Sequence, residues 1–201
     1  FIVKKNPVKA TCITLSHNRP EYLGNAHRSM KEQTFRDFEW IVLDDSASNP
    51  EMDAILSLIQ SDSRFRIVQV HSDNISWLWN KGIDLSNGEY ICTMDDDNWK
   101  DKQYMELMCK ALDNNPAADA VACDWTIKDE VKGGGGTSTP KLDMLEHFNS
   151  IDGGAFMFRK SIIQRIGWFD EDLHTQEDWD YLIRIKKETN GFVLEPNALS
   201  F

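Results

Sequence analysis

The sequence predicts an α/β fold with a Rossmann-like, mostly parallel central sheet flanked by helices. Short apolar segments alternate with amphipathic segments of helical period through the first two thirds of the chain, which is typical of successive βα units. Acidic side chains follow two of these apolar segments, and ligands of open parallel sheets bind at the carboxyl ends of the strands. After residue 127 the alternation changes, so we expect a smaller subregion of different character there.

The first hundred residues contain four expected strands and three expected helices. The segment ATCITLS at 10–16 predicts a buried strand, and Pro20 suits the first turn of the helix that follows. The turn residues Asn87–Gly88 lead into the last strand of this half. The other expected elements are strands at 38–46, 65–70 and 88–97 and helices at 50–60 and 76–86.

The second half begins with the same alternation and then departs from it. The tract KGGGGTSTP at 132–140 predicts a flexible loop, because four consecutive glycines favour a linker over a phosphate-binding turn. Gly191 is expected to end the last helix. The elements expected here are helices at 102–116, 161–169 and 176–191 and strands at 118–127, 153–160 and 192–196.

Composition favours one globular domain and argues against a nucleic-acid partner. The 201 residues are 41% hydrophobic, enough for a core of ordinary size. The formal net charge is −11, so no generally basic surface is available for a phosphate backbone or an anionic membrane. We therefore expect a single domain spanning 1–201.

The cysteines and the hydropathy pattern indicate a cytoplasmic protein. Cys12, Cys92, Cys109 and Cys123 are far apart and lack zinc-site spacing, so they are expected to be reduced core residues. No stretch approaches the roughly 20 apolar residues of a membrane span, and the first residues lack a signal-peptide pattern. Because the chain starts without Met and stops after a strand-like segment, we expect a fragment of a longer protein.

The acidic run of YICTMDDDNWK at 90–100 predicts a site for a cation. Adjacent carboxylates repel one another, and gathering them is unfavourable without a positive charge between them. Oxygen ligands of this kind suit Mg²⁺ or Mn²⁺, which take one or two protein carboxylates and leave positions for phosphates and water. The alternative is that one aspartate caps the next helix while the others are solvated. The pair Asp44–Asp45 is weaker, because Asp-Ser after a strand is an ordinary turn signal.

A second acidic candidate opens the helix expected at 176–191. Carboxylates at a helix start interact favourably with the helix dipole, so Glu177 and Asp178 are consistent with plain capping. A partly desolvated carboxylate that points into a cleft also suits a general base acting on a hydroxyl group. The segment alone leaves both interpretations open.

Taken in order, these segments resemble family 2 glycosyltransferases of the GT-A fold. The resemblance runs from about residue 10 to residue 185 and depends on the order and spacing of several blocks, each weak alone. The blocks are ITLSHNRPEYLGNAHRSMKEQTFRDFEWIVLDDSAS, DNISWLWNKGIDLSNGEYICTMDDDN and GGAFMFRKSIIQRIGWFDEDLHTQEDWDYLIRI.

The resemblance assigns expected roles in donor binding. In this family the loop after the first strand holds the base and ribose, and here it comprises Ser16, His17 and Asn18. Asp45 matches the aspartate that contacts the base. The Asp-x-Asp of the nucleotide-sugar site maps to Asp95, Asp96 and Asp97, with Asp97 as the expected metal ligand and Asp95 on the ribose or sugar side.

The remaining matches concern the sugar and the chemical step. Gly153 and Gly154 match glycines that let the backbone approach the donor sugar. Glu177 and Asp178 match the Glu-Asp pair, whose second member is the usual catalytic base of inverting enzymes. Residues 1–100 are thus the expected nucleotide-binding half and residues 101–201 the acceptor-binding half.

The chain departs from the family pattern in the segment LWNKGI at 78–83. Trp79 stands where the family often carries an arginine, which puts a diphosphate contact in doubt, although Asn80 and Gly82 keep their places. Lys81 is one source of the missing charge, and a solvent-facing helix lysine is the alternative.

Four further side chains have two interpretations each. His17 replaces a more usual tyrosine and is either a base-stacking residue or a loop histidine without a role. His174 is a contact for metal or acceptor, or neither. Trp99 and Trp179 flank the acidic motifs as sugar-stacking platforms or as packing residues.

The resemblance implies a metal-dependent, inverting glycosyltransferase that uses Mn²⁺ or Mg²⁺ and a nucleotide-diphospho-sugar, with a UDP-sugar favoured. The acceptor hydroxyl belongs to a glycan, a lipid-linked molecule or a protein, in surface or envelope glycan synthesis. One alternative is an inactive GT-A-like module that only binds nucleotide or glycan. A nucleotidyltransferase is less favoured, because LSHNRPEYL lacks the Gly-rich, basic loop that such enzymes need after the first strand.

Overall fold

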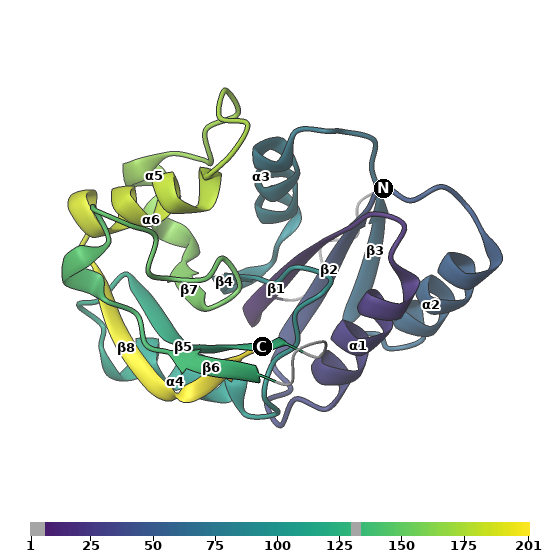
Figure 1. The fold of residues 1–201 in the computed structure, drawn as a ribbon, viewed down its shortest axis with the longest axis horizontal. Helices are drawn as coiled ribbons and strands as arrows, with labels where there is room; N and C mark the ends of the chain where they lie inside the picture. Colours follow the sequence, from purple (N-terminus) through teal and green to yellow (C-terminus); the bar gives the residue numbers. More distant parts are fainter. Residues whose placement is uncertain (1–6, 130–133) are drawn as a thin grey trace.

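The computed structural model describes residues 7–129 and 134–201, and its elements follow the predicted order closely (Figure 1). The strands are β1 Val8–Ser16, β2 Phe38–Asp44, β3 Phe65–Gln69, β4 Gly88–Thr93, β5 Ala120–Asp129, β6 Gly134–Ser138, β7 Phe156–Arg159 and β8 Phe192–Ser200. The helices are α1 Pro20–Lys31, α2 Pro50–Gln60, α3 Ile75–Leu85, α4 Tyr104–Asn114, α5 Ile163–Ile166 and α6 Glu177–Glu188, with 3₁₀ turns η1 Leu142–Met144 and η2 Lys160–Ile162.

The strands form one mixed, mostly parallel sheet. Its order is β3-β2-β1-β4-β7-β5-β6, and β8 pairs with β5. The strands β1 to β4 run parallel to one another, whereas β7 is antiparallel to both β4 and β5. The chain adds strands on one side of β1 and then returns through α3 to place β4 on the other side. Ligands of such sheets bind where the strand order reverses, so the topology places a site beside the ends of β1 and β4.

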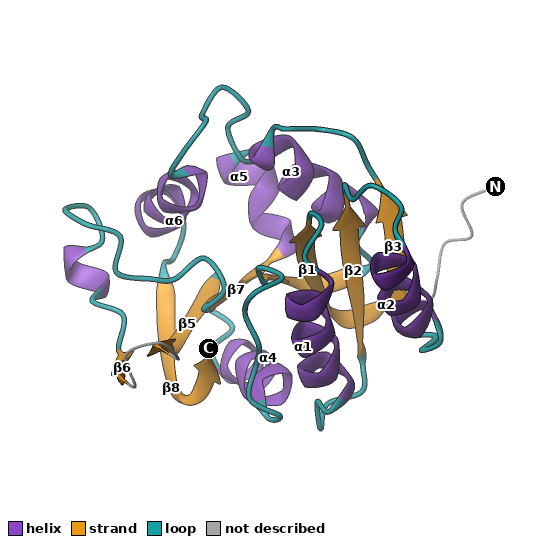
Figure 2. Cartoon of the chain, turned by 45° about the vertical axis from the view of Figure 1, so that its right-hand side comes forward, coloured by secondary structure: helices purple, strands orange, loops and turns teal. Residues whose placement is uncertain are grey.

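Two apolar layers cover the sheet, one on each face. Because strand side chains alternate between faces, Cys12 of β1 packs with α1, α2 and α4, while the next residue, Ile13, packs with α3 and α6. The two sets of helices lie on opposite sides of the sheet in Figures 1 and 2. The site therefore rests on a sheet that is buried on both faces.

The glycine-rich tract is the main correction to the predicted elements. Residues 134–138 form β6 rather than a flexible loop, pairing antiparallel with β5 from Trp125↔Ser138 to Asp129↔Gly134. The hydroxyl oxygens of Thr126 and Thr137 lie 2.8 Å apart across this pair. Backbone pairing with the edge of β5 thus overrides the weak strand propensity of glycine. Residues 132 and 133 of the predicted loop lie outside the described residues.

Several boundaries also differ from the prediction. β4 ends at Thr93, so the aspartates lie in a turn closed by the Asn98 backbone N–H and the Asp95 carbonyl (3.1 Å). The helix expected at 161–169 is shorter, because Gly167 leaves it with φ 77°. β8 extends to Ser200 instead of ending at 196.

Two other sequence-based expectations concern the core and the membrane. All four cysteines are buried and unpaired, as predicted. None of the helices in the described residues is long and apolar enough to cross a membrane.

Candidate active site

A cleft of about 440 Å³ lies at the carboxyl ends of β1, β2 and β4, between α3 and the start of α6. Its volume is in the range of small-molecule sites. Seven of the residues predicted for the site line it: Ser16, His17, Asp45, Asp95, Gly153, Glu177 and Asp178. Asn18, Asp96 and Gly154 are adjacent in sequence to lining residues, and Asn80 hydrogen-bonds to the backbone of the lining residue Phe169. Asp97, the expected metal ligand, is not among the residues that line this cleft and instead lines a separate hollow with Trp99 and Asp152.

The loop after β1 is held by the loop after β2. His17 Nδ1 lies 2.8 Å from the Asp45 carbonyl oxygen. Asn18 adopts a left-handed backbone with φ 54°, and its side-chain oxygen accepts from the Ala47 N–H at 3.1 Å. Such a conformation is uncommon outside glycine but tolerated by asparagine. Ser16 lines the cleft, and its hydroxyl oxygen is buried without a hydrogen-bond partner among the described residues.

The two aspartates after β2 have separate surroundings. Asp44 is buried and accepts hydrogen bonds from Ser46 (2.6 Å) and Gln69 (2.9 Å). Asp45 lines the cleft, and its carboxylate lies 3.1 Å from His71 Nδ1. Asp45 is therefore the member of the pair that a ligand can reach.

Asp95 lines the cleft near other carboxylates. The residue is exposed to solvent in the cleft, although protein surrounds it at longer range. Burial, then the neighbouring charges of Asp152 and Asp97, raises the pKa of Asp95 to about 6, with Lys100 acting in the opposite direction.

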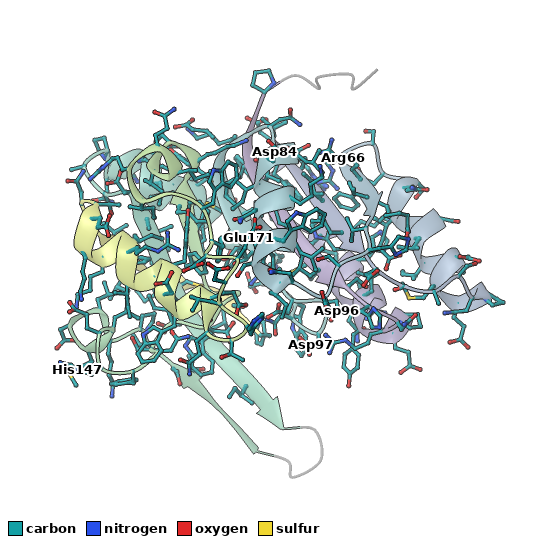
Figure 3. The ribbon with its side chains drawn as sticks, turned by 90° about the horizontal axis from the view of Figure 1, so that it is seen from above. Arg66, Asp84, Asp96, Asp97, His147 and Glu171 are labelled. Carbon is teal, nitrogen blue, oxygen red and sulfur yellow. The ribbon has the colours of Figure 1, made fainter. Side chains whose placement is uncertain are left out.

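The cation between the other two aspartates is Arg19. One guanidinium nitrogen lies 2.5 Å from Asp96 Oδ1, and the other donates to Asp97 Oδ2 at 2.9 Å. The Asp96 side chain is 0% exposed, compared with 43% for Asp97 and 45% for Arg19. Burial raises the pKa of Asp96, and Arg19 opposes this effect. Figure 3 shows Asp96 and Asp97 side by side.

Sequence reasoning missed Arg19, although a signal was present. Arg19 directly precedes Pro20, the first residue of α1, and a cation at a helix N-terminus is unfavourable next to the positive end of the dipole. A basic residue in this place indicates an acidic partner from elsewhere in the chain.

The donor set partly fits a divalent metal. No three His, Cys, Asp or Glu side chains of the described residues are grouped as a preformed metal site. A single exposed carboxylate such as Asp97 suits an ion that takes its remaining ligands from a diphosphate and water. Asp97 could thus hold Mn²⁺ or Mg²⁺ only together with a ligand, and Arg19 is its partner otherwise.

The Gly153–Gly154 turn is supported by a buried lysine. The ammonium of Lys100, a 2% exposed residue, donates to the Gly154 carbonyl oxygen and to Ser200 Oγ (2.8 Å). A Cβ on Gly154 would lie 2.9 Å from Lys100 Nζ, and one on Gly153 would lie 3.4 Å from Asp178 Oδ2. Glycine at 154 therefore makes room for the lysine, and glycine at 153 leaves the Asp178 carboxylate open.

Within the described part of the chain, the hydrogen-bond partners of the Asp178 carboxylate are neutral groups. Its carboxylate accepts from Asn149 Nδ2 at 3.1 Å and from the Trp179 N–H at 2.7 Å. Among the described residues it forms no ion pair, and burial is the main cause that raises its pKa, with Asp152 adding to it. A partly desolvated carboxylate of this kind suits proton abstraction. Glu177 lines the same cleft beside it.

The segment LWNKGI at 78–83 acts on the cleft through packing. Trp79 lines the cleft and packs against Phe169 with ring centroids 6.5 Å apart. Asn80 exchanges two hydrogen bonds with the Phe169 backbone (2.9 and 3.0 Å), so it positions a cleft residue. Lys81 lines a separate hollow with Asp84 and Glu171 and is absent from the cleft lining.

The remaining aromatic and histidine candidates have specific surroundings. Trp99 stacks on Phe201 with centroids 5.3 Å apart, in a small hollow next to Asp97. Trp179 donates its indole N–H to the Leu145 carbonyl at 2.7 Å, which favours packing. His174 is exposed and is not among the residues that line the cleft.

Sequence comparison matches residues 11–167 to the family model described as Glycosyl transferase family 2. EpsH of Bacillus subtilis (strain 168) is 26% identical over 117 residues, which cover 58% of this chain and 33% of EpsH. The chain thus spans about a third of the length of this relative.

Two solved structures share the fold. S. aureus TarS 1-349 in complex with UDP-GlcNAc matches with a TM-score of 0.77 and 18% identity, covering 95% of this chain and 58% of that one. The mannosyltransferase PcManGT from Pyrobaculum calidifontis in complex with GDP-Man and Mn²⁺ matches with a TM-score of 0.68 and 14% identity, covering 98% and 57%. These similarities support the predicted GT-A fold.

Proposed function

We propose that this chain, which belongs to glycosyl transferase family 2, is the catalytic domain of an inverting glycosyltransferase that uses a UDP-sugar. The observation that carries the proposal is the pairing of two different acidic sites at one cleft. Asp95 and Arg19, which pairs with Asp97, line the cleft on the β4 side, and Asp178, whose pKa is raised by burial, lines it on the α6 side. This combination suits a phosphate-bearing donor and a hydroxyl acceptor.

The donor is proposed to lie along the ends of β1, β2 and β4. Asp45 and His17 would bind the base, Ser16 and Asn18 the ribose side, and Asp95 the sugar-phosphate side, where the buried Asp96 would act by positioning Arg19. In the relatives' structures the same fold binds UDP-GlcNAc or GDP-Man. Asp97 would hold Mn²⁺ or Mg²⁺, which when bound supplies charge stabilisation for the leaving diphosphate.

Asp178 is proposed as the general base for the transfer. Its carboxylate accepts the proton of the acceptor hydroxyl while that oxygen forms a bond to the anomeric carbon, and the bond from this carbon to the nucleoside diphosphate breaks. A single displacement of this kind inverts the anomeric configuration. The turn at Gly153 and Gly154 lets the sugar lie close to the backbone, and Glu177 would contact the acceptor beside Asp178.

The acceptor is proposed to be a hydroxyl group of a glycan, a lipid-linked molecule or a protein. The transfer is proposed to serve surface or envelope glycan synthesis and to take place in the cytoplasm. Acidic composition with a net charge of −11 argues against nucleic acid. The stacked Trp99–Phe201 pair beside Asp97 offers an aromatic surface on which an acceptor sugar could pack.

Product analysis tests the proposal against its alternatives. The protein is incubated with UDP-sugars and GDP-sugars, Mn²⁺ and candidate acceptors, and the released nucleotide and the anomeric configuration of the product are measured by NMR. We expect nucleoside diphosphate and an inverted linkage, with Asp97→Ala reduced by orders of magnitude and the exposed-site control Asp143→Ala unchanged. Pyrophosphate release would indicate a nucleotidyltransferase, and donor binding without any release would indicate a binding module.

A further inference from the structure

We infer that Arg19 occupies the place of the metal in the donor-free protein and turns to the donor diphosphate when metal and donor bind. This inference rests on the proposed function for the identity of the diphosphate. Its metal-binding part rests only on the contacts of Arg19. Arg19 would thereby make metal binding depend on the donor.

The two ion pairs of the Arg19 guanidinium differ in strength. We call the contact with Asp96 the inner arm and the contact with Asp97 the outer arm. The inner arm reaches Asp96, which is fully buried, and the carboxylate oxygens of Asp96 have no hydrogen-bond partner of good geometry among the described residues. Separating these charges would leave a buried carboxylate uncompensated, which is strongly unfavourable. The outer arm reaches Asp97, where both side chains are more than 40% exposed, and water screens such a contact. The outer arm therefore opens far more easily than the inner one.

The Asp97 carboxylate oxygen that contacts Arg19 has room for one cation at a time. The guanidinium nitrogen lies 2.9 Å from Asp97 Oδ2, within the space that a divalent ion on that oxygen would need. Two cations this close repel each other strongly at the rim of a protein. A nucleoside diphosphate adds negative charges that can bridge both, so the ion and the released arm of Arg19 are accommodated together only when the diphosphate is present.

Arg19 also supplies a positive charge that the segment LWNKGI at 78–83 does not bring to the cleft. Trp79 stands where an arginine is expected, and Lys81 lies in a separate hollow. Of the described residues that line the cleft, Arg19 is the one with a permanent positive charge. Guanidinium groups bind phosphate oxygens through paired N–H donors, and the ion pair with Asp96 keeps the guanidinium in place while the nitrogen released from Asp97 turns to the phosphate.

The test measures Mn²⁺ binding without nucleotide by electron paramagnetic resonance, in wild type, Arg19→Gln and Arg28→Gln. Arg28 is an exposed arginine on the same helix and serves as the matched control. We expect Mn²⁺ alone to bind Arg19→Gln at least tenfold more tightly than wild type, whereas UDP with saturating Mn²⁺ binds it at least tenfold more weakly. Arg28→Gln is expected to match wild type in both measurements.

A Mn²⁺ affinity of folded Arg19→Gln within twofold of wild type would overturn the inference, whatever happens to UDP binding. If Arg19→Gln does not fold because Asp96 is left unpaired, Arg19→Gln/Asp96→Asn removes the buried charge and is read in the same way. Failure of the wild type to bind UDP with any metal would contradict the proposed function, while the Mn²⁺ measurement would still decide the role of Arg19.

Discussion

The two sides of the cleft place the same type of side chain in opposite electrostatic settings. On the β4 side, Arg19 lies against Asp96 and Asp97. On the α6 side, Asp178 meets only the Asn149 amide and a backbone N–H. Arg19 opposes the rise that burial causes in the pKa of Asp96, whereas no ion pair among the described residues opposes the rise in the pKa of Asp178. The comparison teaches that the same side-chain type meets a fixed cation on one side and neutral donors on the other, and the different roles proposed for the two sides rest on this difference.

The largest expected effect comes from removing the α6-side carboxylate. Asp178→Asn keeps the shape but cannot accept a proton, so kcat/KM for transfer should fall by about 10²–10⁴-fold, with UDP affinity unchanged. Nucleotide-release kinetics and calorimetry measure the two quantities. Asp180→Asn, two residues along the same helix, should keep activity within about twofold. Retention of more than about a tenth of the activity by Asp178→Asn would remove the distinction between the two sides.

The second-largest expected effect comes from removing the buried Lys100 ammonium, which supports the Gly153–Gly154 turn on the β4 side. Lys100→Met removes the buried ammonium that binds the Gly154 carbonyl and Ser200, so the free energy of unfolding should fall by about 2 kcal/mol. The exposed neighbour in Lys102→Met is the matched control and should change stability by less than about 0.5 kcal/mol. Urea unfolding measures both. Equal stability of the two variants would show that Lys100 does not hold the glycine turn.

The pH dependence of kcat/KM tests the role proposed for Asp178 on the α6 side. Since Asp178 must be ionised to accept a proton and its pKa is raised by burial, kcat/KM should fall as pH decreases through a value above the ordinary aspartate range. Asn149 donates to the ionised form, so Asn149→Ala should raise the pKa further and move the acid limb to higher pH. Asn25→Ala, an exposed asparagine on α1, should leave the limb in place. A limb that moves down in Asn149→Ala would contradict the assignment.

The smallest expected effect is at the residue before α6. Gln176 has φ 61°, a left-handed conformation that disfavours side chains with a Cβ. Gln176→Gly should therefore raise the free energy of unfolding by about 0.5–1 kcal/mol. Thr175→Gly, which only adds flexibility, should lower it. Thermal unfolding distinguishes the two, and a destabilised Gln176→Gly would mean that the glutamine side chain stabilises the α6 start.

The first half of the fold was predictable because its signals are local. Strand and helix periods identified β1 to β4 and α1 to α3, and parallel strands bring the residues after them to one edge. Ser16, Asp45 and Asp95 thus came together as expected. The strand β7 lies between β4 and β5 because segments that are far apart in the sequence pair with each other. The local periodicity of side chains does not predict such pairing. The strand β6 was missed for the same reason, since its glycines pair only because β5 offers an open edge.

The site was predictable in its carboxylates but not in their partners. The acidic run after β4 indicated a cation, and the cation that the structure places there is a side chain 78 residues earlier. Likewise, the two readings of Asp178 as a cap or a base could not be separated without knowing its burial and its neutral neighbours. Ion pairs and desolvation arise from tertiary contacts, so the printed sequence alone does not specify them.

The most direct test is calorimetric titration of UDP into wild type and Asp97→Ala, each with and without Mn²⁺. We predict binding by the wild type that requires Mn²⁺ and that is lost in the folded Asp97→Ala variant, because Asp97 is the proposed metal ligand at the diphosphate. Mn²⁺-dependent binding that persists in folded Asp97→Ala, or no binding by the wild type with any metal, would contradict the account.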